Sequence, residues 1–120
     1  MGNPNQLPLY LKLYQLTKYL YIIQKNFPKE YKYTLGETIL RLSWVCVDEF
    51  LFAYDAEERE KYCAIIRLSR TFDRLKIRLR LCYEVGLIRE NQHTHLCSAY
   101  FYDIGVMIGG WKNKYSRFSL

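Results

Sequence analysis

Apolar residues recur every three or four positions along most of this chain, the spacing that places side chains on one face of an α-helix. The pattern predicts four helices and a polar tail, at about residues 8–26, 35–55, 58–85, 91–111 and 112–120. No β-type alternation of useful length occurs between them. Because the predicted connections are short, we expect an all-α fold, an up-down-up-down antiparallel four-helix bundle in which all 120 residues form one domain.

Local signals mark several helix boundaries. Pro28 disfavours helical geometry in the residue before it, so the first helix is expected to stop there. Thr34 and Glu37 have the Thr-x-x-Glu spacing of a capping box, which predicts the start of the second helix. Gly86 suits the left-handed conformation that closes many helices, and Asn91 is the predicted cap of the fourth helix.

The second predicted helix is apolar on two sides. One stripe comprises Leu35, Ile39, Leu42, Cys46, Phe50 and Ala53. The other, roughly opposite, comprises Leu40, Trp44, Val47 and Leu51. A helix of this kind is either buried in a large core or shared between subunits. A chain of 120 residues has little room for the first arrangement, so the pattern favours self-association.

The third predicted helix carries most of the net charge. Between Arg67 and Arg80, six basic residues accompany the single acid Asp73, which gives five of the six net positive charges of the chain. Four arginines fall within a sector of about 80° on a helical projection: Arg67, Arg70, Arg74 and Arg78. The apolar face opposite them comprises Leu68, Phe72, Leu75, Leu79, Cys82 and Gly86. Lys76 and Arg80 lie beside that packing face, on a separate flank.

This clustering of charge indicates a polyanionic partner. Arginine's planar fork binds phosphate through two hydrogen bonds and stacks on exposed bases. RNA or DNA bound by the four arginines would be held mainly through phosphates, with strong salt dependence and little base reading. Two alternatives stay open: a solvated helix face without a ligand, and an interaction scaffold whose arginines meet an acidic protein surface.

Few residues in the sequence suit catalysis or metal binding. The four cysteines are too far apart for the C-x-x-C pairs of metal and redox sites, so they are expected to be structural thiols. His93 and His95 are two residues apart and diverge on a helix. We therefore expect no catalytic residues, no metal and no cofactor; a small nuclease is the weakest alternative. Without a secretion signal or an apolar run of about 18 residues, the protein is expected to be cytoplasmic, with no membrane partner.

Glycines are concentrated near the end of the fourth predicted helix. Gly105 and Gly109 are four residues apart and stand next to Gly110 and Trp111. A glycine inside a helix lowers helix stability by about 1 kcal/mol relative to alanine. The two glycines therefore predict that a neighbouring group approaches the backbone closely there. Close packing of a neighbouring helix is the favoured interpretation, and a side chain from a partner is the alternative.

Three segments resemble a known family. Residues 27–37, Phe-Pro-Lys-Glu-Tyr-Lys-Tyr-Thr-Leu-Gly-Glu, and residues 104–111, Ile-Gly-Val-Met-Ile-Gly-Gly-Trp, resemble the two signature regions of the accessory variability determinant (Avd) proteins of diversity-generating retroelements. Residues 75–81, Leu-Lys-Ile-Arg-Leu-Arg-Leu, resemble the third-helix segment of that family. Val106 departs from the basic or polar residue expected at its position. More loosely, the chain is similar to four-helix proteins encoded in rRNA intervening sequences.

The resemblance implies a basic four-helix bundle that assembles into a homopentamer. It also implies binding to the retroelement's reverse transcriptase and to RNA or DNA, in support of mutagenic cDNA synthesis, without polymerase activity of its own. By position, the basic surface would include Arg74, Lys76, Arg78 and Arg80, with Lys76 and Arg80 facing the polymerase or a subunit interface. The structural signatures would be Phe27, Pro28, Leu35, Gly36, Gly105, Gly109, Gly110 and Trp111. RNA binding without a polymerase, as in the rRNA-associated relatives, is the alternative.

Overall fold

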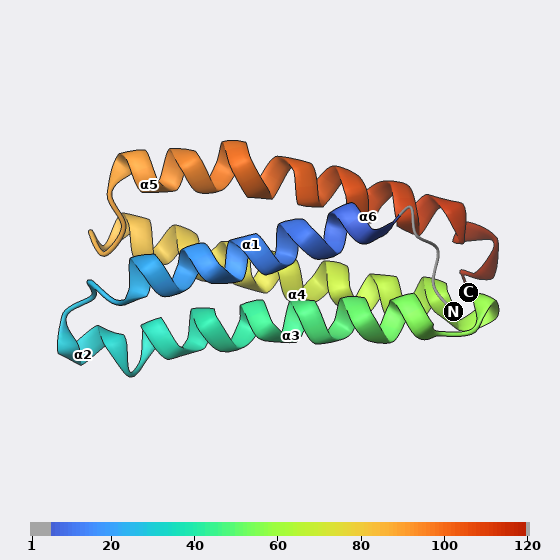
Figure 1. Cartoon of the computed structure of the whole chain (residues 1–120), viewed down its shortest axis with the longest axis horizontal. Helices are drawn as coiled ribbons and strands as arrows, with labels where there is room; N and C mark the ends of the chain where they lie inside the picture. The colour runs from blue at the N-terminus through green and yellow to red at the C-terminus, as the bar shows by residue number, and fades with distance from the viewer. Residues whose placement is uncertain (1–5, 120) are drawn as a thin grey trace.

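The computed structural model describes residues 6–119, and every regular element within that range is helical. The elements in chain order are α1 (Leu7–Gln24), α2 (Lys29–Lys32), α3 (Leu35–Asp55), α4 (Glu58–Glu84), α5 (Glu90–His95), the π-helical η2 (Leu96–Phe101), α6 (Tyr102–Lys114) and the 3₁₀-helical η3 (Ser116–Phe118). The prediction of an all-α fold is thus confirmed. α1, α3, α4 and the continuous α5–η2–α6 segment lie along the long axis of a body measuring 45 × 24 × 24 Å (Figure 1).

The predicted apolar stripes form the core. Five α1 residues are at most 2% exposed: Leu9, Leu13, Leu16, Leu20 and Ile23. The first α3 stripe contributes buried Ile39, Cys46, Phe50 and Ala53, whereas Leu35 and Leu42 are half-buried. The second α3 stripe is divided, because Val47 is buried while Trp44 and Leu51 are 40% and 43% exposed. Part of a second apolar surface is therefore left uncovered on α3.

A buried lysine of α4 closes the end of α3. Lys61 is 7% exposed, and its ammonium donates hydrogen bonds to the carbonyl oxygens of Ala53, at 2.9 Å, and Tyr54, at 2.7 Å. These carbonyls belong to the last turn of α3, where carbonyl oxygens have no N–H partner within the helix. Burial lowers the pKa of Lys61, and the negative charge of Asp55 partly opposes that effect.

The π-helical segment is tied to α1. In a π-helix the backbone hydrogen bonds join residues five positions apart instead of four. Such turns occur mostly as single bulges inside α-helices. Lys12 donates a hydrogen bond from Nζ to the carbonyl oxygen of Ala99 within η2, at 2.8 Å, and lies 3.3 Å from the carboxylate of Asp103. This lysine therefore links α1 to both η2 and α6.

Two of the predicted boundary features are wrong. The Thr34 hydroxyl donates to the carbonyl oxygen of Glu30, one turn earlier, so it forms no capping box with Glu37. Asn91 lies inside α5; the cap residue is Arg89, whose backbone N–H donates to the Gln92 side chain. Both errors arise because a neighbouring residue offers a competing hydrogen bond.

The last helix is longer than predicted, and the segment after it is packed. α6 continues to Lys114 instead of ending at residue 111. Tyr115 is buried, and Arg117 Nη2 lies 2.7 Å from the Glu58 carboxylate at the start of α4. The first part of the polar tail is thus held against α4 through η3, and Leu120 lies outside the described residues.

Two glycines have clear backbone roles. Gly86 has a φ of +85° and follows Val85, the C-cap of α4, as predicted for the residue that closes this helix; it is exposed and does not belong to the packing face. Gly36 is buried where α3 begins. A Cβ added there would lie 2.9 Å from Gln24 Cγ and 3.1 Å from the Tyr31 carbonyl oxygen, so the α1–α2–α3 corner requires glycine.

The four cysteines are free thiols that differ in exposure. Burial raises the pKa of Cys46 to about 12, with a further contribution from the charge of Glu49, and burial raises the pKa of Cys82 to about 11. Because the thiolate is the nucleophile, we expect iodoacetamide at about pH 8 to modify exposed Cys63 in the folded protein and to leave Cys46 and Cys82 unmodified. Peptide mass spectrometry checks this, and all four should react in denaturant. Equal rates at Cys46 and Cys63 in the folded protein would contradict the prediction.

None of the helices within residues 6–119 has both the length and the apolar character needed to cross a bilayer.

Candidate nucleic-acid interface

The arginine row, which comprises Arg67, Arg70, Arg74 and Arg78, follows α4 on the side away from the core. The first three side chains are exposed and Arg78 is half-buried. On the opposite side of α4, the residues predicted to pack are almost completely buried: Leu68, Phe72, Leu75, Leu79 and Cys82. A single helix therefore combines a core face with a cationic face, as its sequence period requires.

The first three arginines of the row share a concave surface, here called the arginine hollow. It has a volume of about 580 Å³ and lies where α4 meets α3. Besides Arg67, Arg70 and Arg74, its lining includes Glu49, Tyr62 and Cys63. Three guanidinium groups in one concave surface can bind several phosphate oxygens at once.

Glu49 is the one acidic residue lining the arginine hollow. Its Oε1 oxygen is buried, and within residues 6–119 no hydrogen bond reaches it. Native proteins leave few such atoms unsatisfied, because an unpaired buried acceptor loses its water without compensation. The negative charge of Glu49 also opposes the positive charge of the three arginines.

The fourth arginine of the row lies in a second concave surface, here called the tyrosine hollow. It has a volume of about 890 Å³. Its lining includes Tyr31, Tyr33, Glu37 and Arg41 from the α2–α3 region, and Ile77, Arg78 and Leu81 from α4. The Arg78 guanidinium donates a hydrogen bond to the carbonyl oxygen of Arg74, at 3.3 Å. The row thus runs from one hollow into the other, which periodicity alone did not predict.

Lys76 and Arg80 lie on another side of α4. Lys76 Nζ is 3.3 Å from the Asp73 carboxylate and 4.8 Å from the centre of the Phe72 ring. The exposed Arg80 forms an ion pair with Glu84 one turn later, at 3.1 Å. Lys76 borders α6, whereas the row borders α3. These two basic residues are therefore geometrically distinct from the arginine row.

The favoured interpretation of the α6 glycines is wrong. A Cβ built on Gly105, Gly109 or Gly110 would meet no atom within 4 Å, so no neighbouring helix packs closely on them. Instead, Gly105 and Gly109 border a hollow of about 230 Å³ whose lining includes Lys76 and Lys112. The tight glycine is Gly36, a signature residue of the other segment. Trp111, the last residue of the α6 signature, is buried in the core.

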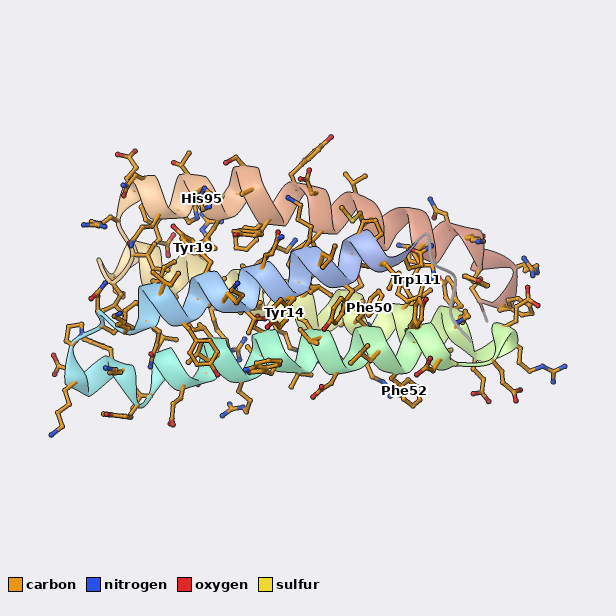
Figure 2. The ribbon with its side chains drawn as sticks, viewed as in Figure 1. Tyr14, Tyr19, Phe50, Phe52, His95 and Trp111 are labelled. Carbon is orange, nitrogen blue, oxygen red and sulfur yellow. The ribbon has the colours of Figure 1, made fainter. Side chains whose placement is uncertain are left out.

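The two histidines are engaged in aromatic packing. His93 is stacked on Tyr83, with ring centroids 4.2 Å apart. The His95 ring packs edge-on against that of Tyr19 (Figure 2), with centroids 4.8 Å apart, and against that of Tyr100, at 5.6 Å. Across residues 6–119, no group of three or more histidine, cysteine or acidic side chains is arranged to hold a metal ion.

Comparison with known protein families gives one match. A family model described as bAvd-like matches residues 9–115, which include the arginine row and both signature segments. Comparisons with curated proteins and with solved structures give no significant match. The family match covers most of the chain and confirms the resemblance seen in its signature segments. The chain belongs to the bAvd-like family.

Proposed function

We propose that this protein is a non-catalytic accessory protein of a diversity-generating retroelement. It binds RNA or DNA through the arginine row, associates with the element's reverse transcriptase, and supports mutagenic cDNA synthesis in the cytoplasm. Family membership supports the retroelement context. The observation that carries nucleic-acid binding is the row of four arginines, three of them exposed, on a single face of α4.

The arginine row suits a phosphate backbone. Arg67 and Arg78 are eleven positions apart, which corresponds to about 16 Å along a helix axis. That length allows the row to contact several successive phosphates. Each contact releases condensed counterions, so affinity should fall steeply as salt rises. Because phosphate contacts fix position without reading sequence, the row itself is expected to bind many sequences.

The proposal includes an up-down-up-down antiparallel four-helix bundle that assembles into a homopentamer. The alternation of chain direction between successive long segments supports the bundle (Figure 1). Exposed apolar residues of α1 and α3 support self-association: Leu11, Tyr14, Ile22, Trp44, Leu51 and Phe52. Sedimentation should give five times the 14.5 kDa mass of one chain. A monomer at micromolar concentration would contradict the assembly.

The flank of α4 is the proposed polymerase-facing or subunit-facing surface. Lys76 and Arg80 lie there, and the neighbouring hollow bordered by Gly105 and Gly109 has space for a side chain from a partner. In a pull-down after nuclease digestion, we expect the tagged chain to retain a co-expressed retroelement reverse transcriptase. The double variant Lys76→Glu, Arg80→Glu should retain less of it.

Three outcomes of the pull-down oppose the proposal. Loss of the polymerase after nuclease digestion would show that nucleic acid alone joins the two proteins. RNA retained by the chain with no polymerase in any condition would favour an RNA-binding role like that of the rRNA-associated relatives. Capture of an acidic protein without nucleic acid would favour the scaffold alternative.

Glu49→Gln is expected to tighten nucleic-acid binding by about threefold to tenfold, because it removes a negative charge from the arginine hollow. The matched control is Asp48→Asn, which changes the net charge equally at an exposed neighbouring position. Fluorescence anisotropy with a labelled RNA measures both variants at one salt concentration. Equal affinities for the two variants would show that Glu49 does not oppose the bound phosphates.

A further inference from the structure

The tyrosine hollow presents two aromatic rings beside two arginines. Tyr31 and Tyr33 are 41% and 60% exposed. Arg41 from α3 and Arg78 from α4 line the same hollow, with Ile77 as an apolar neighbour that is 66% exposed. Large apolar and aromatic side chains exposed together on a folded protein commonly mark a binding surface.

Neither of these two exposed tyrosines has an aromatic partner within the described residues. Elsewhere in the described residues, several tyrosines are stacked on or tilted against another ring: Tyr10, Tyr14, Tyr19, Tyr54, Tyr83 and Tyr100. Within residues 6–119, no ring pairs with Tyr31 or Tyr33 at comparable distance. Both rings can therefore accept a planar ligand.

A hydrogen bond from α1 and close packing against the start of α3 hold the backbone that carries the two tyrosines. The Gln24 side chain of α1 is buried and donates a hydrogen bond from Nε2 to the carbonyl oxygen of Lys32, which lies between them, at 2.9 Å. Gly36 brings the start of α3 against the Tyr31 carbonyl oxygen. A site held in this way loses little conformational entropy when a ligand binds.

The chemistry of the hollow favours an unpaired nucleotide over a protein segment. Every base has a flat face that can stack on tyrosine, whatever its sequence. Arg41 and Arg78 supply the charge that a phosphate on either side of the base requires, and Glu37 offers an acceptor for a base amino group. An apolar protein helix would instead leave these two cations desolvated without partners.

The hollow also continues the arginine row. Arg78 belongs to both, and it is joined to Arg74 by a hydrogen bond within α4. A strand whose phosphates follow the row therefore reaches the two tyrosines at its end. Duplex nucleic acid could use the row but not the rings, because its bases are already stacked and paired.

We propose that the tyrosine hollow binds one or two unpaired nucleotides of a single strand, with bases stacked on Tyr31 and Tyr33 and flanking phosphates on Arg41 and Arg78. The inference rests on the proposed nucleic-acid binding by the arginine row. It adds a preference for single strands that the row alone does not provide.

The test compares single-stranded and duplex DNA of the same mixed sequence, with 2-aminopurine in the single strand. Wild-type chain should quench the 2-aminopurine fluorescence, since stacking on an aromatic ring quenches this base. The double variant Tyr31→Leu, Tyr33→Leu should lose about tenfold to hundredfold in affinity for the single strand and little for the duplex. Its salt dependence should stay like that of the wild type, because the arginines remain.

The matched control is Tyr31→Phe, Tyr33→Phe, which keeps the rings and should bind as the wild type does. Far-ultraviolet circular dichroism confirms folding of both variants. Absence of quenching by the wild type, or equal losses for single strand and duplex, overturns the inference. If the wild type binds with steep salt dependence and the leucine variant binds equally well, only the inference fails. If the wild type binds neither nucleic acid, the proposed function fails as well.

Discussion

Phe50→Ala is expected to lower the free energy of unfolding by about 3–5 kcal/mol, the range for truncating a buried aromatic residue. Phe50 is 0% exposed. Its ring centroid lies 5.9 Å from that of Tyr10 in α1 and 5.6 Å from that of Tyr54 in α3. It also lies 5.3 Å from that of Trp111 in α6, and both of these residues are labelled in Figure 2. One substitution therefore weakens the packing between three helices.

Phe52→Ala is the matched control for this loss. Phe52 lies two residues away on the same helix but is 59% exposed, and Figure 2 shows its side chain pointing away from the other helices. The Arg67 guanidinium lies 5.8 Å from the centre of its ring. We expect a change of less than about 1 kcal/mol. Denaturant unfolding measures both variants, and equal losses would contradict the core assigned to α3.

Replacing all four residues of the arginine row by alanine is expected to weaken binding to RNA or DNA about hundredfold or more at low salt. The reason is that four cations which would each neutralise a phosphate are removed from one face. Three of the four side chains are exposed and none belongs to the core, so the fold should be retained. Electrophoretic mobility shift or fluorescence anisotropy measures the loss.

The control for the row must match its charge. Replacing Lys18, Lys25, Arg59 and Lys114 by alanine also removes four positive charges, from exposed positions outside the row. We expect this variant to lose much less affinity, since its effect is limited to the long-range field. Similar losses in the two variants would show that net charge, and not the row, determines binding.

Much of the fold was predictable because each long helix has one strong apolar period. α3 matches its predicted bounds, and α4 ends within one residue of its predicted end. The packing face of α4, apart from the exposed Gly86, and the terminal role of Gly86 are also confirmed, since both depend on residues close in sequence.

Features that depend on contacts between distant residues were not predictable. The hydrogen bond from Lys12 to Ala99 joins residues 87 positions apart, and no sequence period indicates it. The open surface over Gly105 and Gly109 contradicts the expectation drawn from helix propensity, because propensity does not say where the neighbouring helix lies. The division of the arginine row between two hollows depends on where α3 lies against α4, since α3 residues help to line both hollows.

The most direct test of the proposed function is the salt dependence of binding to single-stranded RNA. The slope of log affinity against log salt should be steep for the wild type, and shallower by about 3 for the four-alanine row variant, given about 0.7–0.9 per phosphate contact. The charge-matched control should keep nearly the wild-type slope. Equal slopes for the wild type and the row variant, or no binding by the wild type, would contradict nucleic-acid binding through the arginine row.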